Sequence, residues 1–210
     1  MKAFLILEDG NVFEGTSIGS AREVISEIVF NTSMTGYLEV LTDPSYAGQA
    51  VVMTYPLIGN YGICHADMES GRPWPDGFIV RELSRIPSNF RSEDTIQNFL
   101  EENDIPGISG IDTRALTKIL REKGTMNGMI TTNENPKIKE YRTGNVVDKV
   151  TCQEKYVLDG DGYKVALMDF GAKRNIARSL NKRGCKVTVY PARTTAEEIL
   201  ADNPDGIMLS

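Results

Sequence analysis

A serine and a tyrosine stand in a turn-rich segment where they could bind a polar ligand. The segment lies between the apolar runs 27–30 and 50–55, and it carries Ser45 and Tyr46 directly after an Asp-Pro pair. A loop held between two strands is a common place for binding residues. A serine in such a turn most often makes only local hydrogen bonds, so the residue pattern by itself favours a structural role for Ser45.

Cys64 and His65 pair a potential nucleophile with a potential base. Adjacent side chains usually point away from each other, and no third group that would orient the imidazole is evident. We therefore interpret this pair as a surface feature without catalytic function. Cys185 follows Gly184 at the start of an apolar run and is expected to be a small core residue.

Asp169 ends the apolar run 165–168, where it could resemble a phosphoacceptor or a nucleotide-contacting acid. A receiver-type site needs further acids after the neighbouring strand, and Tyr190-Pro191 supplies none. A dinucleotide site would need GxGxxG here, and DFGAKR lacks it. We expect a structural or interface role for Asp169-Phe170-Gly171, and helix capping or sheet-edge contacts for Lys173 and Arg174.

The elements that would position these residues fall into two parts. Residues 1–133 mix strands and helices without regular alternation, which predicts an α+β domain with a mixed sheet. Its expected helices begin at Thr35, Ser92 and Asp112, and the last ends at Gly124. Glu8-Asp9-Gly10 is expected to be a hairpin turn, and residues 15–19 a loop.

The carboxyl-terminal part has a much more regular pattern. Apolar runs at 165–168, 187–190 and 207–209 alternate with helical patterns at 173–183 and after Thr195, which forms a capping box with Glu198. We expect Ile199 and Leu200 to face inward. Residues 163–210 therefore predict the first βαβαβ part of a Rossmann-like α/β domain. Residues 134–162 are polar and turn-rich and predict a linker, with a strand turn at 156–158.

Composition limits the classes of function. The chain has 210 residues, 40% hydrophobic and 25% charged, with a net charge of −6 and three cysteines. The negative charge disfavours a nucleic-acid role, and no apolar run is long enough to cross a membrane. The amino terminus is expected to be a strand and not a signal peptide. The odd, scattered cysteines argue against a disulfide framework or a CxxC metal site and favour a reducing cytosol.

Two stretches resemble one known family. FNTSMTGYLEVLTDPSYAGQ, followed by MTYPLIGNYG, resembles the small, glutamine-hydrolysing subunit of carbamoyl-phosphate synthetase. DFGAKRNIARSLNKRG and NPDGIMLS are similar to the start of the class I glutamine amidotransferase domain of that subunit. The resemblance covers the whole chain, although the chain covers only the front part of the family's sequence.

The resemblance implies a function and one site residue. Ser45 occupies the family's glutamine-binding serine position, whereas the cysteine nucleophile and its histidine and glutamate partners lie beyond Ser210. The chain alone is therefore expected to be inactive. The implied partner is a large synthetase subunit that uses ammonia, bicarbonate, Mg and two ATP to make carbamoyl phosphate for arginine and pyrimidine synthesis. No metal or organic cofactor is implied in the small subunit, which is expected to be cytoplasmic, with no membrane or nucleic-acid partner.

Two other functions remain open at the level of sequence. The chain could be a non-catalytic protein-interaction module with a Rossmann-like half-domain, or a nucleotide-binding protein. A coding sequence that continues with Asn-Gly-Pro-Gly and a later Gly-x-Cys-x-Gly elbow would favour the enzyme subunit, whereas a stop codon would favour the interaction module. Nucleotide affinity of the isolated chain would favour the third alternative, and we expect none.

Overall fold

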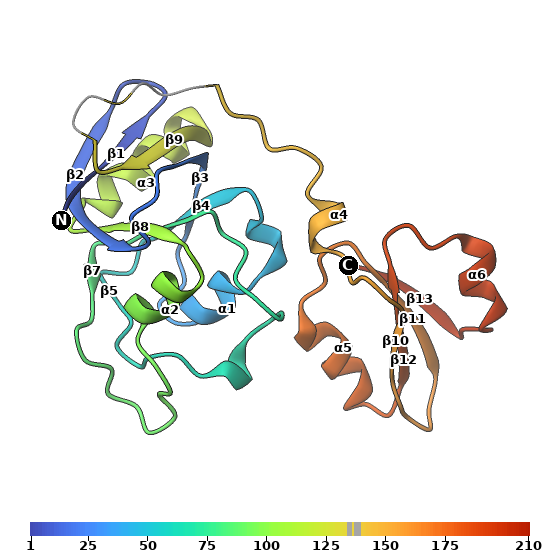
Figure 1. Cartoon of the computed structure of the whole chain (residues 1–210). Helices are drawn as coiled ribbons and strands as arrows, with labels where there is room; N and C mark the ends of the chain where they lie inside the picture. The colour runs from blue at the N-terminus through green and yellow to red at the C-terminus, as the bar shows by residue number, and fades with distance from the viewer. Residues whose placement is uncertain (134–135, 137–139) are drawn as a thin grey trace. The chain divides into compact units, whose positions relative to one another are not determined.

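The computed structural model describes residues 1–133, 136 and 140–210, and these form two compact units. The first unit comprises Met1–Thr42, Tyr46–Met68 and Arg72–Gly144. The second comprises Asn145–Ser210 together with two short stretches, Asp43–Ser45 and Glu69–Gly71. Each unit has its own sheet and core (Figure 1).

The first unit is built on a closed, seven-stranded barrel with the strand order β1-β2-β8-β6-β4-β3-β9. Its strands are β1 (Lys2–Leu7), β2 (Val12–Gly19), β3 (Val24–Asn31), β4 (Gln49–Met53), β6 (Gly77–Ile79), β8 (Pro106–Ser109) and β9 (Met126–Thr131). The pairs β3–β4, β4–β6 and β6–β8 are parallel and the other four are antiparallel. A separate two-stranded sheet pairs β5 (Leu57–Ile58) with β7 (Glu82–Leu83). The sheet is mixed, as predicted. Its closure into a barrel was not predicted.

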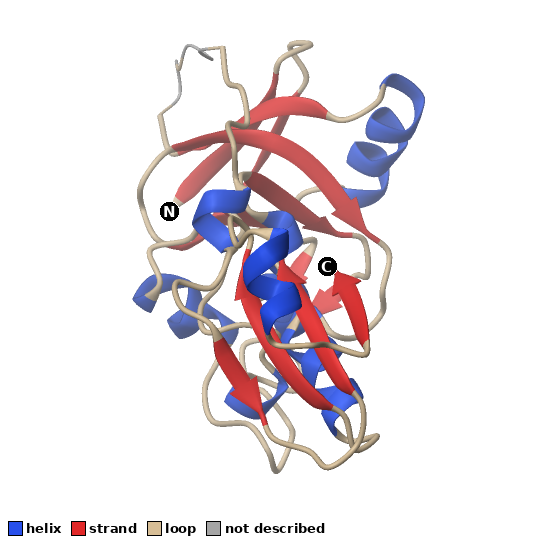
Figure 2. Cartoon of the chain, turned by 90° about the vertical axis from the view of Figure 1, so that its right-hand side faces the viewer, coloured by secondary structure: helices blue, strands red, loops and turns tan. Residues whose placement is uncertain are grey.

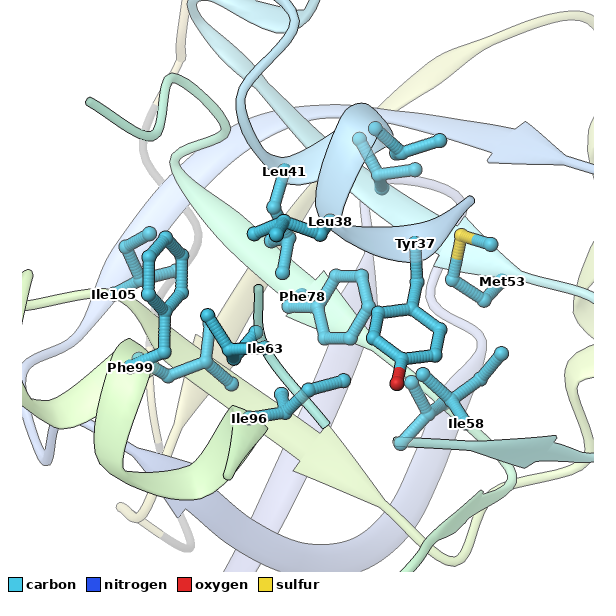
Figure 3. Close-up of a cluster of buried hydrophobic side chains, with 14 of the residues drawn as sticks. Tyr37, Leu38, Leu41, Met53, Ile58, Ile63, Phe78, Ile96, Phe99 and Ile105 are labelled. Carbon is cyan, nitrogen blue, oxygen red and sulfur yellow. The ribbon is translucent and has the colours of Figure 1, made fainter. Parts of the chain in front are cut away.

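Helices pack against the barrel strands in both buried clusters of the first unit. They are α1 (Tyr37–Leu41), α2 (Ile96–Glu102) and α3 (Thr113–Lys123), with short 3₁₀ turns η1 (Pro44–Tyr46) and η2 (His65–Asp67). Along β4 the side chains alternate between two clusters. Val51 and Met53 pack with α1 and α2, whereas Ala50 and Val52 pack with Leu5 and with the buried face of α3. Figure 3 shows the first cluster, which includes Tyr37 and Phe78. Burial on both faces explains the unbroken apolar run of this strand.

The second unit is a four-stranded sheet with the order β10-β12-β11-β13. Its elements are α4 (Val147–Val150), β10 (Tyr156–Leu158), β11 (Lys164–Asp169), α5 (Arg174–Asn181), β12 (Lys186–Pro191), α6 (Ala196–Ala201) and β13 (Gly206–Leu209). β11 pairs in parallel with both β12 and β13, and β10 adds an antiparallel edge strand. The predicted βαβαβ order is therefore present, with its three parallel strands side by side (Figure 2).

The two crossover helices of the second unit lie on opposite faces of its sheet (Figure 1). Leu167 of β11 packs with Ala177 of α5, whereas the adjacent Met168 packs with Ile199 of α6. Because successive strand residues point to opposite faces, side chains of β11 pack against both α5 and α6. This is the doubly wound arrangement, in which ligands bind beyond the carboxyl ends of the strands.

Local signals near helix ends were confirmed at two positions. The side chain of Asp112 accepts hydrogen bonds from the backbone of Arg114 and Ala115, and α3 ends at Gly124. Thr195 and Glu198 form the expected capping box. The tight turn between β1 and β2 was also predicted correctly.

Other helix ends differ from the prediction. α1 begins after Gly36, not Thr35, and α2 is capped by Thr95 instead of Ser92. Gly36 adopts φ = 83°, which glycine reaches without steric cost. Leu200 is 58% exposed although it was expected inside. α6 spans only six residues, and Ile199 alone fills its buried position.

Residues 15–19 form part of β2 and not a loop. Glycine is rare in strands, and the presence of Gly15 and Gly19 led to the wrong prediction of a loop here. A Cβ atom on either would lie 2.3 Å from a carbonyl oxygen, that of Ser109 or of Ile105. The two glycines thus permit close backbone approach to the neighbouring strand.

The predicted linker contains regular structure. α4 lies within 134–162 and was not predicted, whereas β10 confirms the strand turn predicted at 156–158. The continuous part of the second unit begins at Asn145. The part of this prediction that concerns residues 134–135 and 137–139 lies outside the described residues.

Candidate functional site

Ser45 lies in the middle of η1, and its backbone is held by the preceding aspartate. The Ser45 N–H donates to Oδ1 of Asp43 at 2.9 Å, a local turn that Asp-Pro sequences favour. The Asp43 side chain is buried, and its Oδ2 lies 3.0 Å from Nζ of Lys173. Ser45 itself is exposed, and within the described part of the chain its hydroxyl has no hydrogen-bond partner. The turn therefore holds the Ser45 backbone in place, while the hydroxyl stays exposed and without a partner among the described residues.

Tyr46, the neighbouring candidate, has a structural role. Its hydroxyl accepts a hydrogen bond of 3.0 Å from Nδ2 of Asn31, and its ring packs against the cluster shown in Figure 3. Of the two polar residues singled out in this segment, only Ser45 remains available for a ligand.

Asp169 organises the turn at the carboxyl end of β11. Its Oδ1 accepts from the backbone N–H groups of Gly171 and Ala172 at 2.9 and 2.7 Å, and its Oδ2 accepts from Cys152 N–H at 2.7 Å. This buried carboxylate is fully occupied by backbone donors. The structural role predicted for Asp169 is therefore confirmed.

The start of α5 is anchored by a second buried carboxylate, Glu69. Its Oε1 and Oε2 accept from Nδ2 and the backbone N–H of Asn175, at 2.9 and 3.1 Å. The carbonyl of Glu69 accepts from the Arg174 N–H at 2.6 Å. These bonds satisfy backbone donors that a helix leaves unpaired in its first turn. Sequence reasoning missed Glu69 and the buried carboxylate of Asp43, because the Asp-Pro pair predicted only a helix end and Glu69 lies in an irregular segment.

The carboxylates of Asp43, Asp169 and Glu69, which all belong to the second unit, are committed to structural hydrogen bonds or ion pairs. None of them is free to act as a general base, whereas the Ser45 hydroxyl can donate to or accept from a ligand. The arrangement therefore suits binding and not bond breaking.

Cys64 and His65 belong to an exposed polar cluster in the first unit. Nδ1 of His65 lies 2.6 Å from Oε2 of Glu93, and Sγ of Cys64 accepts from the Arg91 guanidinium at 3.2 Å. The hydrogen bond from His65 lowers the pKa of Glu93. Glu93 is thus the orienting group that the sequence did not reveal, but the Cys64 sulfur forms no hydrogen bond with the imidazole among the described residues. A nucleophilic triad needs the imidazole hydrogen-bonded to the nucleophile as well as to the orienting carboxylate.

The other two cysteines are packed into the second unit. Burial, with the nearby Asp169 carboxylate, raises the pKa of the Cys152 thiol to about 11. A thiol with such a pKa is protonated and unreactive at neutral pH. Cys185 packs against the cluster under α5, as expected for a small apolar residue.

Among the described residues, no cluster of three or more His, Cys, Asp or Glu side chains could hold a metal ion. In the same part of the chain, no helix is long and apolar enough to cross a membrane.

Two protein-family models match separate parts of the chain. The family model described as carbamoyl-phosphate synthase small chain, CPSase domain, matches residues 5–130. The chain belongs to the carbamoyl-phosphate synthase small chain family. The class-I glutamine amidotransferase model matches residues 166–210, where the doubly wound sheet lies.

Curated members of the small chain family align over the whole chain. The carbamoyl phosphate synthase small chains of Clostridium perfringens and Listeria monocytogenes are 53% and 50% identical to it over 216 aligned residues. The alignments cover 100% of this chain but only 62% and 60% of those relatives. The chain thus spans about three fifths of the length of the curated relatives it matches.

Proposed function

We propose that this chain is the front portion of the glutamine-hydrolysing subunit of a carbamoyl-phosphate synthetase. The observation that carries the proposal is the combination, in one polypeptide, of a small-chain domain at 5–130 and the beginning of a class-I glutamine amidotransferase domain at 166–210. The second part supports a role in releasing ammonia from glutamine. The first is named for the synthetase that would consume this ammonia.

In the proposed reaction, a cysteine thiolate attacks the side-chain carboxamide carbon of glutamine. Ammonia leaves, a glutamyl thioester forms, and water then hydrolyses the thioester to glutamate and free thiol. Dividing one difficult displacement into two easier steps is the usual gain from covalent catalysis. The resemblance places this cysteine and its histidine and glutamate partners on a segment after residue 210. The ammonia would pass to the large subunit, where bicarbonate, Mg and two ATP complete the synthesis of carbamoyl phosphate.

Within residues 1–210 we propose that Ser45 binds the unreactive backbone end of glutamine. Its exposure, its hydroxyl without a partner among the described residues and its backbone anchored by Asp43 support this role. A contact to the end of the substrate that does not react has nearly the same strength in the ground and transition states. Its loss should raise KM and leave kcat almost unchanged.

The test is Ser45→Ala in the complete subunit with its synthetase partner, assayed separately with glutamine and with free ammonia. A hydrogen bond to a charged group contributes about 1.5–3 kcal/mol, so KM for glutamine should rise about ten- to a hundredfold. Activity with ammonia should be unchanged. Ser33→Ala is the matched control, because Ser33 is also exposed and its hydroxyl makes no hydrogen bond with the described residues. Equal losses with glutamine and with ammonia would instead assign Ser45 to the contact between subunits.

A further inference from the structure

A broad groove of about 1200 Å³ runs along the exposed face of α3 in the first unit. Its walls come from α3, from residues that follow β3 and β4, and from Arg81, which follows β6. Pockets for small molecules usually measure about 300–1000 Å³. This groove is larger and suits a segment of polypeptide better than a small ligand.

Four cationic side chains line the groove, and three of them have no partner in the part of the chain that the structure describes. Arg114, Lys118 and Arg121 lie at i, i+4 and i+7 along α3, so they share one face of the helix. Lys118 approaches Glu122 at 3.9 Å. The side chains of Arg81, Arg114 and Arg121 are exposed and form no hydrogen bond or ion pair with the residues that the structure describes.

The position of Arg114 is unfavourable for the isolated helix. It lies in the first turn of α3, where the partial positive charge of the helix N-terminus repels a cation. The carboxylate of Asp112, at the N-cap, accepts hydrogen bonds from the backbone N–H groups of Arg114 and Ala115 and offsets part of this repulsion, but it forms no ion pair with the Arg114 guanidinium among the described residues. The chain as a whole carries a net charge of −6. Three arginines without a partner among the described residues therefore lie along a groove whose lining also includes Asp112 and Glu122, and their guanidinium groups are available to carboxylates of an external partner.

The spacing of the cations indicates what kind of anion would fit. From Arg114 to Arg121 the helix rises roughly 10 Å, at about 1.5 Å per residue. A row of this length offers separate pairing positions to several anionic groups at once. Several carboxylates carried by one segment can occupy these positions, because alternate residues of a strand are about 6.6 Å apart and i, i+4 positions of a helix about 6 Å apart.

We propose that the groove along α3 docks an acidic segment of a protein partner. The identity of that partner rests on the proposed function, which makes it the large synthetase subunit. Arg81, Arg114 and Arg121 pair with carboxylates of this segment, and the attraction steers the two proteins together at low ionic strength. Ser45 is not among the residues that line this groove.

The experiment compares association of the complete subunit with purified large subunit as ionic strength is varied. The variant Arg81→Gln/Arg114→Gln/Arg121→Gln should bind about tenfold more weakly or worse at low salt, and its affinity should depend less on salt. Arg85→Gln is the matched control, because Arg85 is an exposed arginine outside the groove with no partner among the described residues. It should bind as the wild type does. Glutamine hydrolysis by the free subunit should be unchanged in both variants.

A single charge reversal separates docking from folding. Arg114→Glu places an anion in the first turn of α3, which favours the helix, so its Tm should be at or above that of the wild type. Its binding to the large subunit should nevertheless fall by about tenfold or more.

The outcomes distinguish the docking site from the proposed function. A wild-type complex that none of these variants weakens would overturn the docking site and leave the proposed function standing. Failure of the wild-type protein to bind the large subunit would overturn both. If inorganic phosphate or ATP raised the Tm of the wild type but not of Arg114→Glu, the groove would be a small-anion site and the docking proposal would be wrong.

Discussion

At the scale of single residues, the three cysteines differ in what surrounds their sulfur atoms. Cys64 lies in a polar, exposed cluster, Cys152 is held as a thiol with a raised pKa, and Cys185 lies among apolar side chains. None has an imidazole positioned to accept its proton within the described residues. We therefore expect the described cysteines to take no part in the glutamine chemistry that the family implies, and Ser45 as a glutamine ligand remains a proposal.

We therefore expect the polypeptide of residues 1–210 to release no ammonia from glutamine above background. Because no hydrogen bond joins Cys64 to the His65 imidazole among the described residues, Cys64→Ala should leave that background unchanged. A coupled ammonia assay on both proteins measures this. Turnover by the unsubstituted chain that disappears in Cys64→Ala would contradict the expectation.

Asp9 provides a pH-dependent contribution to the stability of the first unit. Nζ of Lys123 donates to its Oδ2 at 2.8 Å, and this hydrogen bond, with that from the Asn11 N–H, lowers the pKa of Asp9 to about 2. A carboxyl group whose pKa is lower in the folded state than in the unfolded chain stabilises the fold above its unfolded pKa. That contribution is lost as the pH falls through the folded value.

The free energy of unfolding of Asp9→Asn should therefore lie below that of the wild type above about pH 4, and the difference should shrink towards pH 2. Glu8→Gln is the control, since Glu8 lies in the same turn and its side chain has no partner among the described residues. Chemical denaturation at a series of pH values measures the effect. A difference that stays constant across this range would rule out the Lys123–Asp9 pair as its cause.

At the scale of elements, glycine decides how closely the barrel strands approach. Gly10 and Gly19 both adopt positive φ, 89° and 64°. At Gly10 nothing lies within 4 Å of an added Cβ, whereas at Gly19 that atom would meet the Ile105 carbonyl oxygen at 2.3 Å and Leu100 Cβ at 2.7 Å. A glycine-to-alanine substitution therefore tests only the cost of the backbone conformation at Gly10. At Gly19 it tests that cost together with the steric clash of the added Cβ atom.

Gly10→Ala should cost about 1–2 kcal/mol, the penalty for a non-glycine residue in the left-handed region. Gly19→Ala should cost more, since the backbone at Ile105 must shift as well. Urea unfolding of the two variants gives the comparison directly. Equal losses would mean that β2 moves away from the chain around Ile105 at little energetic cost.

At the scale of the whole molecule, residues 140–146 form no regular secondary structure and lie where the chain passes for the last time from the first compact unit to the second. The Arg142 side chain in this segment is 86% exposed. At the far end of the chain, β13 is an edge strand whose four residues are all exposed, including Ile207 and Leu209. The barrel, by contrast, has no free edge.

Limited trypsin digestion should accordingly cut first near Arg142. The fragment containing the barrel should persist, and the carboxyl-terminal fragment should be degraded sooner because its sheet has an exposed edge. Mass spectrometry of a digestion time course identifies both products. Equal persistence of the two fragments would mean that something covers β13 in solution.

The sequence by itself determined the features that depend on neighbours a few residues away. The Asp112 cap, the Thr195–Glu198 box, the β1–β2 turn and the βαβαβ order all follow from hydrogen bonds and periodicity within one element or between successive ones. The family and the position of Ser45 were also recognisable from residues alone. Ser45 as a glutamine ligand stays a prediction.

Only the tertiary structure decided the features that join distant segments. Closing the barrel requires β2 to pair with β8, as at Thr16 and Ser109, and no local pattern specifies that partner. The assignment of Glu69 to the start of α5, of Glu93 to His65, and of Arg81 to the groove along α3 likewise depends on chain segments that meet only after folding. The physical reason is that such contacts form when the apolar faces of remote elements are buried together, and side-chain chemistry at one position does not specify which remote segment it will meet.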